Sequence, residues 1–141
     1  MSGTLGSVTY VFFDVGGTLG DVTVHGNTAQ LALYPDTQRL LDTLRAMGSV
    51  KLGVISNVVP TMTSADLAHM LTTAGVGAYF APNAIVASTS AGSAKPAAAI
   101  YQFAATQVGQ PIAACLFVGE DLAEIIGARV AGMQAQLKPR P

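Results

Sequence analysis

The sequence lacks the features that mark secreted, membrane-spanning or nucleic-acid-binding proteins. Cysteine occurs once among 141 residues, which excludes both an intrachain disulfide and a cysteine-rich metal site. Only 11% of the residues are charged, the net charge is −1, and no run of lysine and arginine indicates nucleic acid as a partner. No apolar stretch reaches the roughly 18 residues of a membrane-spanning helix, and the N-terminus lacks a signal-peptide pattern. These absences predict a cytoplasmic protein with neither nucleic acid nor a membrane as a partner.

The composition is otherwise that of an ordinary folded domain. Half of the residues are apolar, which is enough to build a core and argues against disorder. The length predicts one domain over residues 1–141. The single thiol, Cys115, lies in the apolar run 113–118 and is expected to be buried. A surface with so little charge is also compatible with a homo-oligomer.

Short apolar runs alternate with helical patterns along the chain. Strands joined by helices at this spacing pair in parallel through right-handed crossovers. The alternation therefore predicts an α/β fold, a three-layer Rossmann-like sandwich around a mostly parallel sheet. Strands are expected over residues 10–14, 51–56, 84–87 and 116–118, helices over 35–47, 64–74, 96–108 and 121–131, a small hairpin over 22–28, and a loop over 88–94.

Polar residues gather where the expected strands end. In an open parallel sheet, ligands bind beyond the carboxyl ends of the strands. A carboxylate there can attack phosphorus, Mg²⁺ prefers carboxylate and phosphate oxygens, and a lysine neutralises phosphoryl oxygens. The strand ends therefore predict phosphoryl chemistry with Mg²⁺ as cofactor and a phosphorylated small molecule or macromolecule as substrate. The four clusters are Asp14–Leu19, Ser56–Asn57, Lys95–Pro96 and Gly119–Asp121.

The order and spacing of these clusters resemble the four motifs of the haloacid dehalogenase-like hydrolases. The resemblance runs from about Val11 to Met133, and four motifs in order are far more specific than any one of them. It implies the fold of that superfamily and an aspartyl-phosphate mechanism. The matching segments are Phe12–Leu19, Val54–Asn57, Lys95–Pro96, and Val118–Glu120 followed by Glu124 and Gly127–Met133.

Carried over to this chain, the resemblance implies a catalytic and substrate-binding set. Asp14 would be the nucleophile. Ser56, the main-chain N–H of Asn57 and Lys95 would hold the phosphoryl oxygens, with Gly16 at the same site.

The resemblance also implies a metal site, which departs from the family pattern. Asp14, the main-chain carbonyl of Gly16 and Glu120 would be direct Mg²⁺ ligands, and Glu124 a water-mediated one. Both glutamates replace aspartates of the family, and the longer side chain must fold back to reach a small octahedral ion. Asp121 is an alternative ligand, one residue out of register. We expect weakened metal affinity, with Glu120 favoured over Asp121.

Gly16 is the most informative departure. Family phosphatases carry a second aspartate here, which protonates the leaving group and later activates water. Its loss removes general acid–base help worth about 10²–10⁴-fold in rate. Hydrolysis could then survive for substrates with good leaving groups, such as acyl or aryl phosphates, and should be slow for alkyl phosphates.

The segments that could hold a cap domain are short. Residues 19–35 have room only for the hairpin, and 58–94 for an ordinary helix and strand, so a capless domain is predicted. His25 at the hairpin tip could replace the missing proton donor, but a solvent-exposed turn residue is favoured. Asp21 matches a position that is often aspartate in the family, and a solvated residue is equally expected there.

Two functions from different classes remain. The favoured one is a Mg²⁺-dependent phosphatase that uses Asp14. The alternative is a catalytically degenerate domain that binds a phosphorylated ligand or a protein. Gly16, the two glutamates and the missing cap favour binding, whereas retention of Asp14 and Lys95 favours the enzyme.

Overall fold

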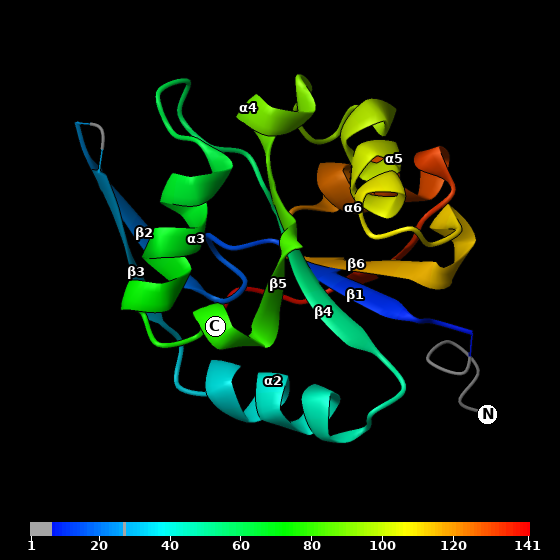
Figure 1. The fold of residues 1–141 in the computed structure, drawn as a ribbon, viewed down its shortest axis with the longest axis horizontal. Helices are drawn as coiled ribbons and strands as arrows, with labels where there is room; N and C mark the ends of the chain where they lie inside the picture. The colour runs from blue at the N-terminus through cyan, green and yellow to red at the C-terminus, as the bar shows by residue number, and fades with distance from the viewer. Residues whose placement is uncertain (1–6, 27) are drawn as a thin grey trace.

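The computed structural model describes residues 7–26 and 28–141. In this part of the chain five parallel strands form one sheet with the order β5-β4-β1-β6-β7 (Figure 1). The central strand is therefore β1, which is hydrogen-bonded to a neighbour on each side. The strands are β1 (Tyr10–Phe13), β4 (Lys51–Ser56), β5 (Phe80–Ala87), β6 (Cys115–Gly119) and β7 (Gln134–Leu137).

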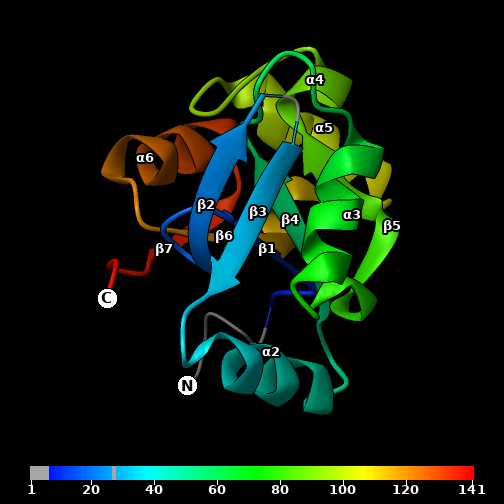
Figure 2. The ribbon, with the colours of Figure 1, turned by 90° about the vertical axis from the view of Figure 1, so that its left-hand side faces the viewer.

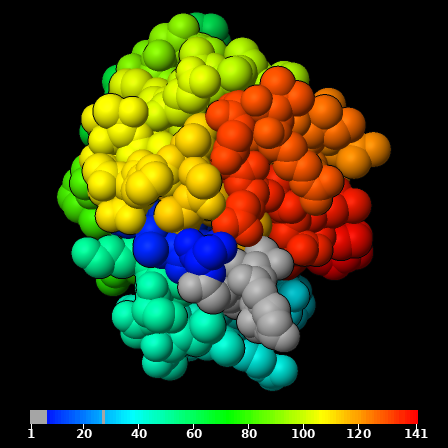
Figure 3. All heavy atoms as spheres, turned by 90° about the vertical axis from the view of Figure 1, so that its right-hand side faces the viewer, coloured from blue at the N-terminus to red at the C-terminus, as the bar shows by residue number. Residues whose placement is uncertain are grey.

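Helices cover both faces of this sheet, and the alternation of side chains along β1 explains why. Val11 and Phe13 belong to a core on the side of α2 (Thr37–Ala46) and α3 (Ser64–Thr73). Tyr10 and Phe12 point the other way, as successive strand residues must, and join a second core. This second core lies under α5 (Ala98–Gln107) and α6 (Leu122–Ala131), and Figure 3 shows this side of the molecule. The three-layer α/β sandwich without a cap domain is confirmed.

A separate two-stranded antiparallel hairpin stands beside the main sheet. It consists of β2 (Gly20–His25) and β3 (Thr28–Leu33), and both views of the ribbon place it next to α3 (Figures 1 and 2). The predicted hairpin is confirmed, although Asn27 in its turn lies outside the described residues. The hairpin is the only element of regular structure described between β1 and α2.

The loop predicted over residues 88–94 is wrong in its first half. Residues Ser88–Ala91 form the short helix α4. Two side-chain hydrogen bonds hold it: the Val58 N–H donates to Ser88 Oγ at 3.0 Å, and Thr89 Oγ1 donates to the Met62 carbonyl at 2.6 Å. Both bonds are tertiary, so the serine- and threonine-rich sequence could not reveal them.

Element boundaries differ elsewhere by a few residues. The helix predicted from Pro96 begins at Ala98, so Pro96 is not in its first turn, and the Lys95–Pro96 peptide is cis. The third strand, expected over 84–87, begins at Phe80, and β7 was not predicted. Two single turns of 3₁₀ helix, η1 (Gly77–Tyr79) and η2 (Ile112–Ala114), precede β5 and β6.

Cys115 is fully buried at the start of β6, as predicted. Burial raises the pKa of its thiol to about 11, which keeps it protonated at neutral pH. No helix within residues 7–26 and 28–141 has the length and apolar character to cross a bilayer.

Candidate active site

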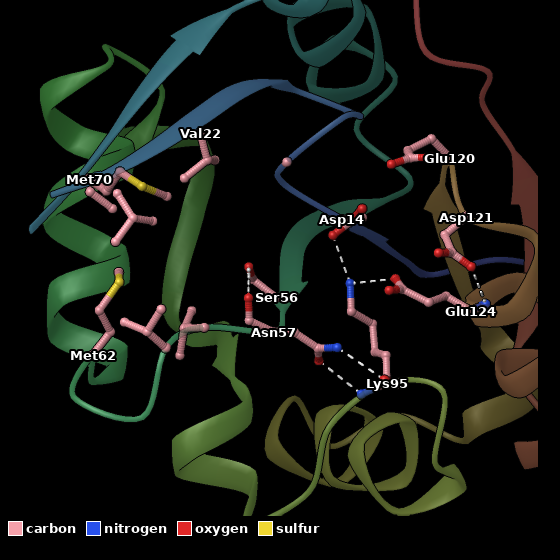
Figure 4. A pocket seen from close by; sticks show the side chains of 15 residues that line it. Asp14, Val22, Ser56, Asn57, Met62, Met70, Lys95, Glu120, Asp121 and Glu124 are labelled. Atoms are coloured by element: carbon pink, nitrogen blue, oxygen red, sulfur yellow. Dashed lines mark hydrogen bonds and ion pairs between the residues drawn. The ribbon is translucent and has the colours of Figure 1, made fainter. Parts of the chain in front are cut away.

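A cleft of about 240 Å³ opens at the carboxyl edge of the sheet, and all four sequence clusters contribute to it. Figure 4 shows its two sides: Asp14, Lys95, Glu120 and Glu124 lie opposite Val22, Met62 and Met70. The strand ends thus meet as the topology requires. The lining residues are Asp14, Gly16, Val22, Val24, Ala29, Ser56, Asn57, Val58, Val59, Met62, Met70, Lys95, Glu120, Asp121 and Glu124.

Asp14 and Lys95 form a buried ion pair in this cleft. The Lys95 ammonium lies 2.7 Å from Asp14 Oδ1, and the whole residues are only 5% and 8% exposed. The Asp14 N–H donates to the Val118 carbonyl at 2.9 Å, which ties the end of β1 to β6. Thr18 Oγ1 is 3.4 Å from Asp14 Oδ2. One carboxylate oxygen therefore faces a cation and the other a hydroxyl.

Asn57 fixes the main chain of Lys95. Its side-chain amide donates to the Lys95 carbonyl at 3.0 Å, and its Oδ1 accepts from the Lys95 N–H at 2.9 Å. The lysine side chain then crosses the Phe117 ring, with Nζ 5.0 Å from the ring centre. The adjacent Ser56 is buried at the end of β4 and lines the cleft. The second motif thus contributes to the cleft directly and also positions the third.

Glu124 is the second carboxylate beside Lys95. Its Oε1 lies 2.8 Å from Lys95 Nζ, and this buried oxygen accepts no well-aligned hydrogen bond from the described residues. Burial raises the pKa of the Glu124 carboxyl, and the nearby lysine opposes that rise. Tyr101 donates from its hydroxyl to the Glu124 carbonyl at 2.7 Å, which anchors this turn of α6. The ion pair with Lys95 is a contact that the sequence did not predict.

The turn after Asp14 depends on two glycines with different requirements. Gly17 has φ +82°, and a Cβ there would lie 2.5 Å from Glu120 Oε1, so a side chain at this position would be strained. Gly16 lines the cleft and has no positive φ. A Cβ on Gly16 would make ordinary contacts, 3.6 Å and 3.9 Å from atoms of Val22. A side chain could therefore be accommodated at residue 16 but not at residue 17.

Glu120 and Asp121 line the cleft, but each already has a partner. Arg140 Nη2 lies 2.9 Å from Glu120 Oε1, a contact that sequence analysis missed because Arg140 belongs to no motif. Asp121 is the N-cap of α6, and its Oδ1 accepts from the Glu124 N–H at 3.2 Å. Capping accounts for this aspartate without a metal.

The predicted metal ligands line the same cleft, but their side chains are not arranged around one metal position. In residues 7–26 and 28–141, no three side chains of histidine, cysteine, aspartate or glutamate are arranged to hold a metal ion. Asp14, Gly16 and Glu120 nevertheless line one cleft. Their donors are oxygen atoms, and Mg²⁺ typically takes only one or two protein carboxylates and completes its shell with water and phosphate oxygens. The chemistry of this donor set fits Mg²⁺.

Two further residues lie away from the cleft. His25 is exposed at the end of β2 and is absent from the cleft lining, as expected of a solvated turn residue. Asp21 accepts from the Tyr34 hydroxyl at 2.7 Å and lies 3.9 Å from Arg140 Nη1 at the exposed surface. The geometry therefore gives neither residue a direct role in the cleft.

Replacing Lys95 by methionine should lower the free energy of unfolding by about 3–5 kcal/mol. The variant leaves Asp14 and Glu124 buried without their shared cation, and an unpaired buried charge costs this much. Urea unfolding followed by circular dichroism measures the change. The matched control is Lys51→Met at an exposed position, with an expected effect within about 0.5 kcal/mol.

Adding Glu124→Gln to Lys95→Met should recover part of the loss, because one of the two unpaired carboxylates is removed. A Lys95→Met loss below about 1 kcal/mol would show that the pair contributes little to the fold.

Comparison with known proteins gives both a family and structural relatives. Residues 21–132 match the family described as haloacid dehalogenase-like hydrolase. No curated protein sequence matches the chain. The matched segment is most of the chain and includes the second, third and fourth sequence clusters.

Solved structures share the fold. An uncharacterized protein from Listeria monocytogenes serotype 4b is 24% identical with a TM-score of 0.73, over 91% of this chain and 76% of that one. An uncharacterized protein from Corynebacterium glutamicum is 21% identical with a TM-score of 0.67, over 93% and 85%. A HAD phosphatase from Thermococcus onnurineus is 26% identical with a TM-score of 0.64, over 78% of this chain but 48% of its own.

Proposed function

The chain belongs to the haloacid dehalogenase-like hydrolases, and from this membership we propose that it is a Mg²⁺-dependent phosphatase with Asp14 as its nucleophile. The observation that carries the proposal is the buried ion pair between Asp14 and Lys95 in a cleft at the strand ends. Burying a carboxylate and a lysine carries a desolvation cost, and a role in ligand chemistry at this edge of the sheet accounts for their presence there. The proposed substrate is a phosphate monoester or anhydride.

In the first proposed step, an oxygen of Asp14 attacks phosphorus. The new P–O bond gives an aspartyl phosphate as the bond to the leaving group breaks, and the leaving group takes the electron pair. Lys95 would neutralise the charge of the phosphoryl oxygens, and the Ser56 hydroxyl would donate a hydrogen bond to them; both residues line the cleft. In the second step, water hydrolyses the acyl phosphate, which restores Asp14 and releases inorganic phosphate.

Asp14, Glu120 and the Gly16 carbonyl would hold Mg²⁺, which supplies charge neutralisation for the bound phosphate. For Glu120 to bind, its side chain must give up the contact with Arg140. The longer glutamate and this competing cation both favour a weak metal site. Glu124, already paired with Lys95, is a weaker candidate for a role near the metal.

A second candidate function is a domain that binds a phosphorylated ligand or a protein without turnover. Two observations favour it: Gly16 offers no proton donor, and Arg140 neutralises Glu120. The same cleft would then serve binding alone.

Beryllofluoride, a mimic of the phosphoryl group, separates these two functions. With Mg²⁺ present, the phosphatase should form a stoichiometric adduct on Asp14, which is visible as bound ¹⁹F resonances and in a crystal structure. Omission of Mg²⁺ should abolish the adduct. Absence of both adduct and bound metal at saturating concentrations would contradict the phosphatase and favour the binding domain.

A further inference from the structure

We infer that this cleft selects phosphate monoesters whose leaving group is a compact aromatic ring. The inference deepens the proposed function and rests on it for the chemical step. It depends on two features, the apolar side of the cleft and the lack of an acidic side chain at residue 16.

The cleft is divided by polarity. Its polar side carries Asp14 and Lys95, and the opposite side is a wall without a titratable group among the described residues. Figure 4 shows Val22, Met62 and Met70 on this side, facing the polar groups. We call this side the apolar wall; it consists of Val22, Val24, Ala29, Val58, Val59, Met62 and Met70.

The two hairpin valines of the apolar wall are left partly uncovered by the protein. Val22 is 37% and Val24 45% exposed, although both line the cleft, whereas Met62 and Met70 beside them are 4% and 5% exposed. Val22 and Val24 are two residues apart in β2 and therefore point to the same face of the hairpin. An apolar ligand group in the cleft would remove both side chains from water, which favours its binding.

The cleft volume limits the size of that group. At about 240 Å³ it is smaller than the ~300–1,000 Å³ typical of pockets for drug-sized ligands. A phosphoryl group and one ring are therefore a better match than an extended substrate.

Gly16 adds the second constraint, because it lies next to the same wall. The atoms closest to the place of its missing side chain belong to Val22. A leaving group that contacts Val22 thus departs beside residue 16, whose side chain supplies no proton. When the P–O bond breaks, the oxygen leaves with the electron pair as an anion and takes a proton from water.

Leaving without a proton selects for an acidic leaving group. A phenol has a pKa of about 10, well below the pKa of water, and alkyl alcohols resemble water in this respect. The apolar wall favours a ring, and the missing acid at residue 16 favours an acidic leaving group. An aryl phosphate meets both requirements. Acetyl phosphate and similar acyl phosphates have an acidic leaving group but no ring to contact the apolar wall.

Binding of non-hydrolysable analogues tests the apolar wall without turnover. Calorimetry with Mg²⁺ present should show phenylphosphonate binding at least about tenfold more tightly than methylphosphonate. In Val22→Thr/Val24→Thr, which keeps the side-chain shape and β-branching, the ratio should fall to about threefold or less. The matched control is Thr23→Val in the same strand: Thr23 points to the other face of the hairpin, outside the cleft lining, and the ratio should not change.

Equal affinities of the wild-type protein for the two phosphonates would overturn the inference. So would a ratio that survives in the double variant.

Turnover then separates this inference from the proposed function. The double variant should lower kcat/KM for phenyl phosphate by about threefold or more and leave kcat/KM for acetyl phosphate, which has no ring, unchanged. An equal fall in kcat/KM for phenyl phosphate and acetyl phosphate would leave the phosphatase standing and overturn the aryl preference. Selective phosphonate binding without turnover of any ester would support the aryl-binding cleft and contradict the phosphatase. Free phenyl phosphate and a phosphotyrosyl peptide carry the same ester, so their relative kcat/KM identifies the source of the ring.

Discussion

The Asp14→Asn variant should lose turnover of every phosphate ester by about 10⁴-fold or more, because the amide cannot form the aspartyl phosphate. Asparagine has nearly the same shape as aspartate, and Lys95 keeps its second carboxylate, Glu124. The fold should therefore survive, with a circular dichroism spectrum unchanged from the wild type. Release of inorganic phosphate from phenyl phosphate, with Mg²⁺ present, measures the loss.

Asp36→Asn is the matched control for this variant. Asp36 is an exposed carboxylate before α2 and outside the cleft lining, so its kcat/KM should stay within about twofold of the wild type. A folded Asp14→Asn protein that retains more than about a tenth of the activity would eliminate Asp14 as nucleophile.

The Gly16→Asp variant should gain activity, by about 10²–10⁴-fold in kcat on phosphates with poor leaving groups such as glycerol phosphate. The structure leaves room for the change: residue 16 lines the cleft, its φ is not positive, and an added Cβ would come no closer than 3.6 Å to Val22. The new carboxyl group would protonate the leaving oxygen and later accept a proton from water. Esters with good leaving groups should gain much less, because they do not need the acid.

Gly16→Asn separates acid catalysis from packing. The amide has the same size but no transferable proton, so it should give no gain. The gain of the aspartate variant should also vanish at high pH, as its carboxyl group loses the proton that it donates. Equal activities of the two variants across pH would mean that residue 16 does not limit the rate through its acidity.

The fold could be predicted from the sequence because its central strands are short, continuous apolar runs. The run Tyr10–Phe13 is apolar on both faces, and the structure buries both. A strand buried on both faces needs a helical layer on each side, which fixes the sandwich. The edge strand Gln134–Leu137 alternates glutamine with apolar residues over only four positions, too short a pattern to separate from a loop.

The members of the site could be predicted, but not the partners of each side chain. The sequence predicts that Lys95 faces Asp14, because both belong to the polar clusters that follow expected strands. Its second partner, Glu124, comes from a different motif, and the pairing depends on how α6 sits against the sheet. The roles of these residues in catalysis remain predictions.

The apolar wall had no sequence signal at all. Val22 and Val24 alternate with polar residues as in any half-buried strand, and the methionines match an ordinary core pattern. Only the position of the hairpin next to α3 brings them together opposite Asp14. Contacts between elements far apart in the chain cannot be derived from local periodicity.

The hairpin and the main sheet are separate sheets. Val22 and Val24 lie on the hairpin at partly exposed positions. A substitution at such a position typically changes the free energy of unfolding by about 0.5 kcal/mol or less. Asp14 and Lys95 lie outside the hairpin. Asp14 follows β1 and is hydrogen-bonded to Val118 of β6, and Lys95 precedes α5 and is held by Asn57 after β4. Substitutions in β2 would therefore change the lining of the cleft while the Asp14–Lys95 ion pair stays in place.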